Sequence, residues 1–332
     1  MAKTVTIGIP VFNVERYVRE SLLSALNQTY ADIEFLIVDD RGQDQSMSIV
    51  RQLVAEHPRG SAVRIIENEK NVGIAATRNT IIDEAQGSYL FFLDSDDVIS
   101  PDCIALHVHY LEQYQCDFVC GSSVYVFQNG DKAIYTQYRE LVVVGGEEYC
   151  VVKRYCSHDN TINVLVCNKL YRKDFLISNG IRCAPGLVHE DVWFTWLLIL
   201  SARSCVLMPA VTYQYYERHA SICNDSATEA VTKRHYDRGQ MLEMMVSSVK
   251  AHTGLPRTIR QLLAIRMIRK ALSYSKAVVS EQTLSSVDKK RLTLRNTSNG
   301  LGLFTCWSMD FRKNLEMLRC LTRLMLFRLS IK

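Results

Sequence analysis

"YLFFLDSDD", residues 89–97, joins four apolar residues to a cluster of three acids. An apolar run of this length that ends in turn-forming residues is typical of a buried strand. The carboxylates of Asp94, Asp96 and Asp97 follow the run directly and repel one another unless a positive charge lies among them. The alternative is a solvated turn, because aspartate favours turns. The segment therefore predicts a buried strand and raises the question of which cation lies at its end.

Strand-like and helix-like segments alternate around this run. The expected strands are 4–10, 34–40, 63–68, 88–94 and 117–127, and the expected helices are 14–26, 46–56, 74–85 and 101–115. Repeated strand–helix units of this length predict an α/β fold with a mainly parallel, doubly wound sheet. Ligands of such sheets bind beyond the carboxyl ends of the strands.

The rest of the chain departs from this pattern. Residues 128–225 are expected to form a mixed α/β region, with strands at 161–176 and 204–218 and a helix near 190–202. Residues 226–332 are expected to be mostly helical, with helices at 260–280 and 307–331.

Composition excludes several classes of protein. There are 39 lysines and arginines against 35 aspartates and glutamates, a net charge of +4, which is not the excess of a nucleic-acid binder. The eleven cysteines never follow a C-x-x-C spacing, which argues against a disulfide framework or a zinc ribbon. No signal peptide is visible, and no apolar run approaches the ~18–20 residues of a membrane span. We therefore expect a cytoplasmic protein that does not bind nucleic acid.

Polar segments follow four of the expected strands. They are 10–13, 39–44, 68–73 and 94–97, and they should meet at one edge of the sheet. Hard divalent cations such as Mg²⁺ and Mn²⁺ bind carboxylate oxygens, usually from one or two side chains together with substrate phosphates. The missing positive charge is therefore interpreted as a divalent metal that carries a diphosphate.

Four segments, in this order and at these intervals, resemble the family 2 inverting nucleotide-sugar glycosyltransferases, which have the GT-A fold. They are IPVFNVERYVRESLLSALNQTY, FLIVDDRGQDQS, NEKNVGIAATRN and YLFFLDSDD. The resemblance covers residues 4–127 closely and continues more loosely through 168–175, 189–194 and 216–222. It implies a nucleotide-sugar-binding half at 1–127, an acceptor-binding half at 128–225 and a helical C-terminal region at 226–332.

The resemblance also implies which residues surround the donor. The nucleotide and diphosphate would be bordered by Pro10, Val11, Phe12, Asn13, Asp39, Asp40, Asn71, Gly73, Arg78, Asp94 and Ser95. Asp40 would accept a hydrogen bond from the base, with Asp39 as the neighbour most easily confused with it. Asp96 would be the main ligand of Mn²⁺ or Mg²⁺. His219 would complete the metal shell or pair with a phosphate, although a lone histidine is more often structural.

Two positions depart from the family pattern. The family usually has Tyr–Asn where this chain has Phe12 and Asn13, a change that keeps an aromatic ring and loses a hydroxyl. Arg41 intervenes between the paired acids and Gly42. We expect Arg41 to point to water, with a phosphate contact as the alternative.

Glu190 and Asp191 open the helix expected near 190–202. Acids in a first helical turn are favoured by the helix dipole, which is the structural explanation for the pair. The resemblance implies a second role, because the family places a Glu–Asp pair at such a helix start and uses the aspartate as general base. Asp191 would then take the proton of the attacking acceptor hydroxyl, with Glu190 in support.

The last segment, 306–332, carries six basic residues and two acids. Arg312, Glu316, Arg319 and Arg323 share one helical face, and leucines and a methionine fill much of the rest. The pattern fits a helix at 307–332 that lies on an anionic membrane, on the inner face of the plasma membrane. A helix packed on the domain, or a homodimer contact, fits it equally well.

The sequence thus favours a metal-assisted, inverting glycosyltransferase of bacterial surface polysaccharide synthesis. Its donor would be a nucleotide sugar, with a UDP-sugar favoured as the family's usual donor, and its acceptor a glycan or a lipid-linked hydroxyl. A nucleotidyltransferase on a related fold, or a degenerate nucleotide-binding or membrane-associated scaffold, is the alternative. A Rossmann dehydrogenase is disfavoured because the first strand is not followed by G-x-G-x-x-G.

Overall fold

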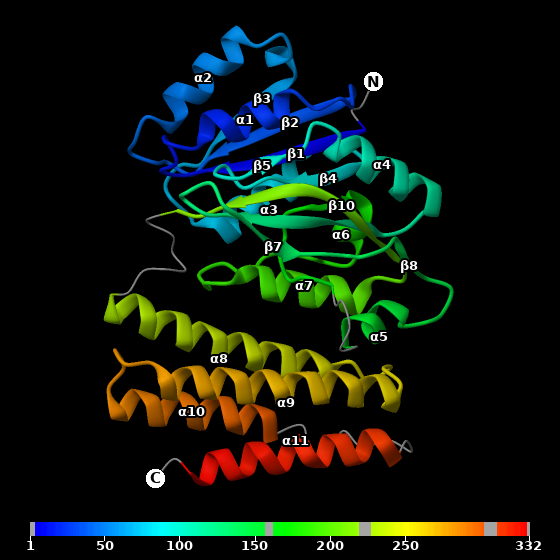
Figure 1. Ribbon diagram of the computed structural model, residues 1–332, viewed down its shortest axis with the longest axis vertical. Helices are drawn as coiled ribbons and strands as arrows, with labels where there is room; N and C mark the ends of the chain where they lie inside the picture. The colour runs from blue at the N-terminus through cyan, green and yellow to red at the C-terminus, as the bar shows by residue number, and fades with distance from the viewer. Residues whose placement is uncertain (1–3, 157–161, 219–226, 302–310, 331–332) are drawn as a thin grey trace. The chain divides into compact units, whose positions relative to one another are not determined.

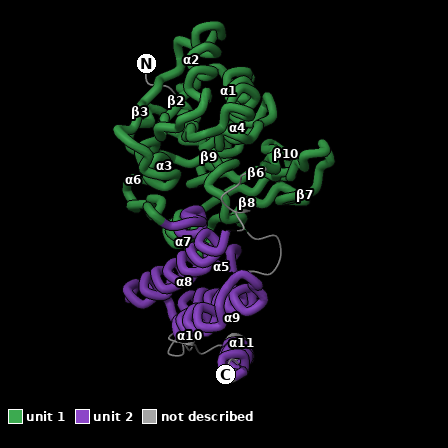
Figure 2. Tube along the Cα trace, turned by 90° about the vertical axis from the view of Figure 1, so that its left-hand side faces the viewer, with its two compact units in different colours: residues 1–151, 159–186, 194–218 green, residues 152–158, 187–193, 219–332 purple. Residues whose placement is uncertain are grey.

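The computed structural model describes residues 4–156, 162–218, 227–301 and 311–330. The chain divides into two compact units (Figure 2). Unit 1 comprises residues 1–151, 159–186 and 194–218, and unit 2 comprises residues 152–158, 187–193 and 219–332.

Unit 1 is built on a mixed sheet (Figure 1). The sheet has ten strands, and the order along its main path is β3-β2-β1-β4-β9-β6-β10-β5. The strands of this path are β1 (Val5–Val11), β2 (Ile33–Asp39), β3 (Val63–Glu67), β4 (Tyr89–Phe92), β5 (Val98–Ile99), β6 (Phe118–Val126), β9 (Lys169–Arg172) and β10 (Cys205–Tyr216). β7 (Lys132–Thr136) pairs with β6, and β8 (Val142–Val144) pairs with β10. The first four strands of the order run parallel, as do β6 and β10, while β9 is antiparallel to both of its neighbours.

Helices connect the parallel strands as the sequence predicts. They are α1 (Val18–Leu26), α2 (Ser46–Glu56), α3 (Ile74–Glu84) and α4 (Cys103–Tyr114), with a short 3₁₀ turn at Gly60–Ala62. The predicted α/β fold with its mainly parallel strands and helical C-terminal region is confirmed. α1 begins later than the Val14 stripe suggests, because the Val14 amide donates to Ser46 Oγ at 2.8 Å and holds a loop there.

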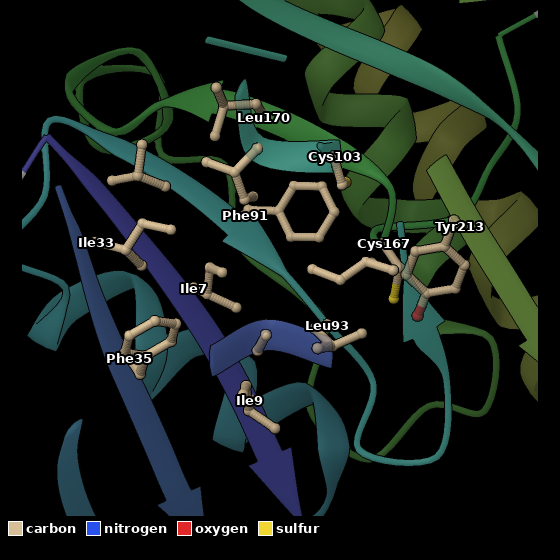
Figure 3. Packing of buried hydrophobic residues seen from close by; sticks show 14 of the residues in the cluster. Ile7, Ile9, Ile33, Phe35, Phe91, Leu93, Cys103, Cys167, Leu170 and Tyr213 are labelled. Atoms are coloured by element: carbon tan, nitrogen blue, oxygen red, sulfur yellow. The ribbon is translucent and has the colours of Figure 1, made fainter. Parts of the chain in front are cut away.

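The core of unit 1 lies on both faces of the parallel strands. All seven residues of β1 and all seven of β2 are buried, as expected for strands covered by helices on both faces. Ile7, Ile9, Phe35, Phe91 and Leu93 pack into one cluster (Figure 3). Burial of each such side chain contributes about 1.5–3 kcal/mol, so this cluster fixes the strands whose ends form the candidate site.

The predicted strand at 161–176 is wrong within the described residues. Only Lys169–Arg172 is a strand, and it is followed at once by helix α6 (Lys173–Ser178). Asn168 interrupts the run with a φ of 56°, and its side-chain amide donates to the carbonyls of Gly121 and Ser122 at 2.9 and 3.0 Å. This left-handed residue ends the extended chain before β9 and ties it to β6. The small elements β5, β7, β8 and α5 (Cys150–Cys156) were not expected from the sequence.

Unit 2 is largely helical. Its long helices are α8 (Thr228–Ala251), α9 (Arg257–Ser280), α10 (Ser286–Leu301) and α11 (Phe311–Leu329), and α9 contacts the other three. A Cβ atom at Gly300 would lie 2.5 Å from Leu324 Cδ2, so α10 and α11 approach closely there. Of the helices that the structure describes, none is long and apolar enough to cross a lipid bilayer.

Candidate active site

The carboxyl ends of four parallel strands form one edge of the sheet. The register pairs Val11 with Asp39 and Asp39 with Glu67, so the ends of β1, β2 and β3 are level. β4 lies on the other side of β1 and runs in the same direction. The Asp40 amide donates to the Val11 carbonyl at 2.9 Å and continues this pairing past the strands. The expectation that the polar segments share one edge is confirmed.

Asp40 anchors the loop that follows β3. Its Oδ1 accepts hydrogen bonds from Asn68 Nδ2 at 2.8 Å and from the Val72 amide at 2.9 Å. Its Oδ2 accepts one from the Gly73 amide at 2.9 Å. Asp40 is 3% exposed, and both of its oxygens are engaged by the protein. Gly73 has a φ of 83°, a conformation that favours glycine, which positions its amide at the start of α3.

Asp39 is differently engaged. Its Oδ1 accepts a hydrogen bond from the Arg41 amide at 2.8 Å, and Arg41 Nη1 lies 4.0 Å from its Oδ2. Arg41 is exposed, as the sequence predicts, with 44% of its side-chain surface accessible. Its guanidinium also donates from Nη1 to Glu67 Oε2 at 2.7 Å and from Nε to the Asn68 carbonyl, two contacts that the sequence pattern did not predict.

Asp94 is held by two side chains from other segments. Arg78 Nη2 of α3 donates to its Oδ1 at 2.6 Å, and Cys167 Sγ donates to its Oδ2 at 2.9 Å. Burial alone would raise the pKa of Asp94, but Arg78 and the Cys167 hydrogen bond lower it below its usual value. Asp94 is therefore an ionised carboxylate paired with a buried guanidinium.

Asp96 carries the second acid–arginine pair of this edge. The Arg218 Nε atom forms an ion pair with its Oδ2. Burial raises the pKa of Asp96 to about 6; Arg218 opposes this shift and Asp94 adds to it. The carboxylate is thus buried beside a second negative charge, an arrangement that additional positive charge stabilises.

Asp97 joins the acidic turn to β10. Its Oδ2 accepts a hydrogen bond from the Tyr213 hydroxyl at 2.7 Å and its Oδ1 accepts one from the Tyr216 amide at 2.9 Å. Burial and the neighbouring Asp96 raise the pKa of Asp97 well above its usual value. Its partners are structural, so Asp97 fixes the turn in which Asp94 and Asp96 lie.

The loop after β1 places an aromatic ring at the same edge. Phe12 is 43% exposed, whereas Pro10 and Val11 before it are buried. Asn13 has a φ of 50°, and its Oδ1 accepts a hydrogen bond from the Gln43 amide at 2.8 Å, which links this loop to the one after β2. Asn71 is exposed, whereas Ser95 is buried in the acidic turn.

The oxygen atoms at this edge suit a hard divalent cation. Within the described ranges, no group of three or more His, Cys, Asp and Glu side chains is arranged to hold a metal ion. Mg²⁺ and similar ions need fewer protein ligands, since they usually bind one or two carboxylates and take their remaining ligands from water and substrate phosphates. Asp96, buried beside the charge of Asp94, fits that description. His219 lies outside the described residues.

Glu190 and Asp191 lie in the first turn of α7 (Glu190–Ser201), as predicted. Both belong to unit 2, and Asp191 Oδ1 accepts a hydrogen bond from the Val192 amide at 2.9 Å. His189 before them has a φ of 67° and lies 3.3 Å from Arg238, measured from Nε2 to Nη2. Burial, and then the Arg238 charge, lower the pKa of His189 to about 4. A neutral imidazole therefore directly precedes the two acids that begin the helix.

Sequence reasoning missed two partners of the acidic turn. Cys167 and Arg218 contact Asp94 and Asp96 from segments far along the chain, and no spacing rule connects them. Arg218 lies in the segment 216–222, which carries the looser resemblance, directly before His219. The sequence therefore pointed to this segment as part of the site but did not identify Arg218.

The family model described as "Glycosyl transferase family 2" matches residues 6–178. A relative is glycosyltransferase GlyA of Streptococcus pneumoniae, which is 26% identical over 325 residues, 88% of this chain. The chain spans 46% of the length of GlyA.

Solved structures share the fold. TarS residues 1–349 from S. aureus is 16% identical, with a TM-score of 0.71 over 99% of this chain and 90% of that chain. The same TarS fragment in complex with UDP-GlcNAc is 17% identical, with a TM-score of 0.58 over 97% of this chain and 90% of that chain. Mannosyltransferase PcManGT from Pyrobaculum calidifontis, in complex with GDP-Man and Mn²⁺, is 14% identical, with a TM-score of 0.53 over 99% of this chain and 88% of that chain.

Proposed function

This chain belongs to glycosyl transferase family 2, and on that premise we propose that it transfers a sugar from a nucleoside-diphosphate sugar to an acceptor hydroxyl with inversion at the anomeric carbon. The observation that carries the proposal is the pair of acid–arginine contacts, Arg78 to Asp94 and Arg218 to Asp96, at the carboxyl edge of the sheet. Two guanidinium groups can each contact phosphate oxygens, and two acids can contact a ribose or a cation.

Each donor contact follows from the loop geometry. The exposed Phe12 ring can stack on the nucleobase. Asp39 is the better candidate to accept a hydrogen bond from the base, because Asp40 uses both of its oxygens to hold the loop after β3. The donor is proposed to be a UDP-sugar, which is supported by the likeness to TarS, a protein that has been solved with UDP-GlcNAc.

Asp96 would hold the divalent cation, Mn²⁺ or Mg²⁺, with Asp94 beside it. Such an ion, when bound, neutralises the negative charge that the leaving diphosphate acquires. Arg218 contributes positive charge to the same carboxylate, and Arg78 keeps Asp94 ionised. These residues of the chain orient the diphosphate and balance its charge while the sugar is transferred.

Asp191 is proposed as the general base, with Glu190 supporting it. A bond forms between the acceptor oxygen and the anomeric carbon while the bond from that carbon to the diphosphate oxygen breaks. The hydroxyl proton passes to the Asp191 carboxylate, and the diphosphate leaves from the opposite side. A single displacement of this kind inverts the anomeric configuration without a covalent enzyme intermediate. The acceptor is proposed to be a glycan or a lipid-linked hydroxyl in bacterial surface polysaccharide synthesis.

The proposed reaction is tested by its products. The protein is incubated with UDP-, GDP- and CDP-sugars and Mn²⁺, and release of nucleoside diphosphate is followed together with the anomeric proton of the sugar product by NMR. Diphosphate release with an inverted anomer supports the proposal. Retention of the anomeric configuration would contradict it. In a parallel incubation with nucleoside triphosphates and a sugar phosphate, release of pyrophosphate would indicate a nucleotidyltransferase instead.

We also propose that α11 binds the surface of an anionic membrane. The helix buries Met317, Leu321 and Leu324 within unit 2, so it packs on its own unit. Its other side exposes Leu318 (46%), Met325 (42%) and Leu326 (62%). Arg319 and Arg323 are also exposed and follow the apolar positions around the helix. An apolar strip beside a basic one suits a membrane that carries negative lipid headgroups.

Vesicle flotation tests this membrane contact. A Leu318→Ser and Leu326→Ser double variant should lose binding to phosphatidylglycerol vesicles while its fold is unchanged. Val287→Ser, which alters a 74% exposed residue of α10, is the matched control and should bind like the unaltered protein. If the unaltered protein does not bind these vesicles, the exposed strip of α11 has another role.

A further inference from the structure

Four aromatic side chains gather on neighbouring strands of unit 1, away from its core. They are Tyr125 on β6, Phe127 directly after that strand, Tyr135 on β7 and Tyr215 on β10, and we call them the aromatic plate. The ring centroids of Tyr125 and Tyr215 lie 5.5 Å apart, and those of Tyr135 and Tyr215 lie 5.4 Å apart. The centroids of Tyr125 and Phe127 lie 4.9 Å apart.

The geometry of the plate leaves ring surface uncovered. The rings of Tyr135 and Tyr215 are within 6° of parallel, and those of Tyr125 and Tyr135 are within 29°. The Tyr125 and Tyr135 centroids are only 6.3 Å apart, so the three tyrosines form a triangle and not a column in which the middle ring covers both neighbours. Tyr135 is 45% exposed and Phe127 is 40% exposed, whereas Tyr138 and Tyr171 of the same unit are fully buried.

The strands hold the plate in place before any ligand arrives. Tyr125 is paired with Tyr215 across the parallel β6 and β10 and with Ala133 across β6 and β7. Aromatic side chains fixed on a sheet lose little conformational entropy when they bind. An exposed group of apolar rings that is already ordered is therefore a surface prepared for a partner.

The chain of β10 links the plate to the acidic turn. Tyr215 lies between Tyr213, whose hydroxyl donates to Asp97, and Tyr216, whose amide donates to Asp97. Arg218, three residues further along the chain, pairs with Asp96. One strand thus carries both the support of the acidic turn and a member of the plate, and all these residues belong to unit 1.

From this we infer that the aromatic plate binds a saccharide unit of the acceptor, so that the acceptor is a glycan; the inference rests on the proposed function. One face of a pyranose ring presents C–H groups that pack on aromatic rings, while its hydroxyl groups need polar partners at the rim. The plate has such a rim. Glu217 Oε2 accepts a hydrogen bond from the Gln128 amide at 3.3 Å, and Lys132 Nζ donates to Gln214 Oε1 at 3.0 Å.

The size of the plate favours a saccharide over a protein partner. A stable protein interface uses about 20–30 residues on each side. The plate has four rings bordered by polar side chains, an extent that matches a few sugar units. Its place on the strand that supports the acidic turn also suits a chain whose end must reach the sugar donor.

The test compares Tyr135→Ala with Tyr135→Phe and Tyr236→Ala. Tyr236 on α8 is 44% exposed and serves as the matched control for loss of an equally exposed ring. The probe is an array of bacterial surface glycans, followed by saturation-transfer NMR on the glycans that bind. The unaltered protein, Tyr135→Phe and Tyr236→Ala should bind the same glycans, and Tyr135→Ala should bind them about tenfold more weakly.

The outcomes separate this inference from the proposed function. Equal glycan binding by Tyr135→Ala, or no glycan bound by the unaltered protein, would overturn the saccharide assignment. So would a dimer of the unaltered protein that Tyr135→Ala dissociates. Calorimetric binding of UDP by each variant is measured in parallel. Loss of glycan binding with unchanged UDP binding supports the inference, whereas glycan binding without any nucleotide binding leaves the plate assigned and contradicts the proposed donor.

Discussion

Arg78 Nη2 donates a 2.6 Å hydrogen bond to Asp94 Oδ1 and joins α3 to the end of β4. The side chain of Arg78 is 6% exposed and that of Asp94 is 24% exposed, so the pair is shielded from water on one side. The guanidinium keeps Asp94 ionised against the effect of burial. The same contact therefore contributes to the stability of unit 1 and to the charge of the acidic turn.

Removal of one partner of the Arg78–Asp94 pair should destabilise the protein more than removal of both charges. Arg78→Met leaves a largely shielded carboxylate without its counter-charge and should lower the free energy of unfolding by about 3 kcal/mol. The Arg78→Met and Asp94→Asn double variant should cost less than Arg78→Met alone, because no unpaired charge remains. Denaturant unfolding checks both. Arg182→Met, which removes an arginine that pairs with the exposed Asp83, should cost less than about 1 kcal/mol.

The two acids at the end of β2 should have different roles, with Asp39 in nucleotide binding and Asp40 in stability. Asp40→Asn replaces an acceptor of three hydrogen bonds and should lower the thermal unfolding midpoint. Asp39→Asn should leave that midpoint nearly unchanged and weaken UDP binding by about tenfold, the cost of one hydrogen bond to a polar ligand group. Calorimetry and thermal melts on both variants decide the matter. The reverse pattern would assign the base contact to Asp40.

Asp191→Asn should abolish sugar transfer and leave donor binding intact. The amide cannot take the hydroxyl proton but has nearly the same shape, so only the chemical step is lost. Turnover and donor affinity are measured on the same preparation. The control is Asp174→Asn, which changes an acid in the first turn of α6 and should retain full turnover. Retained turnover in Asp191→Asn would show that another residue acts as the base.

His107 should make the stability of unit 1 fall as the pH is lowered. It is fully buried in α4, with Nδ1 2.8 Å from the Cys103 carbonyl oxygen, and burial lowers its pKa from 6.5 to about 4. Between these values the unfolded chain binds a proton that the folded chain does not. The folded state is therefore most stable at a pH above 6.5, the pKa of this histidine in the unfolded chain. The free energy of unfolding should fall by about 2 kcal/mol between about pH 7 and about pH 5.

Replacement of the imidazole tests this sign. His107→Gln should show a smaller drop in the unfolding midpoint over that pH range, measured by denaturant titration at each pH. His109→Gln, at an exposed position of the same helix, should show the same drop as the unaltered protein. A drop of equal size in both variants would assign the acid sensitivity to other groups.

The sequence predicted the parallel strands well, because their signal is local. β1 and β2 are continuous apolar runs buried on both faces, and the polar segments after them meet at one edge for topological reasons. Arg218 and Cys167 could not be predicted, because their contacts with Asp96 and Asp94 depend on how distant segments pack. The strand expected at 161–176 failed for a similar reason, since the left-handed Asn168 is stabilised by carbonyls of β6.

In the C-terminal helix α11 as well, the sequence predicted the helix but not which of its side chains are buried. Its periodicity indicated an amphipathic helix, and α11 is a helix. The apolar residues alone did not reveal which of them pack inward. Leu321 is buried, while Leu318 and Met325, which belong to the same predicted apolar set, are exposed. Only the contact of α11 with α9 and α10 selects the inward face.

We propose that Asp96 and a divalent cation bind a nucleoside diphosphate at the acidic turn. The most direct measurement is calorimetric titration of the unaltered protein and of Asp96→Ala with UDP, GDP, CDP and ADP, each with and without Mn²⁺. Asp83→Asn, which changes an exposed acid, is the control. We predict that one diphosphate binds tightly only with Mn²⁺, that Asp83→Asn binds it equally and that Asp96→Ala loses the dependence on the metal. Binding that is equally tight without Mn²⁺, or unchanged in Asp96→Ala, would contradict the claim.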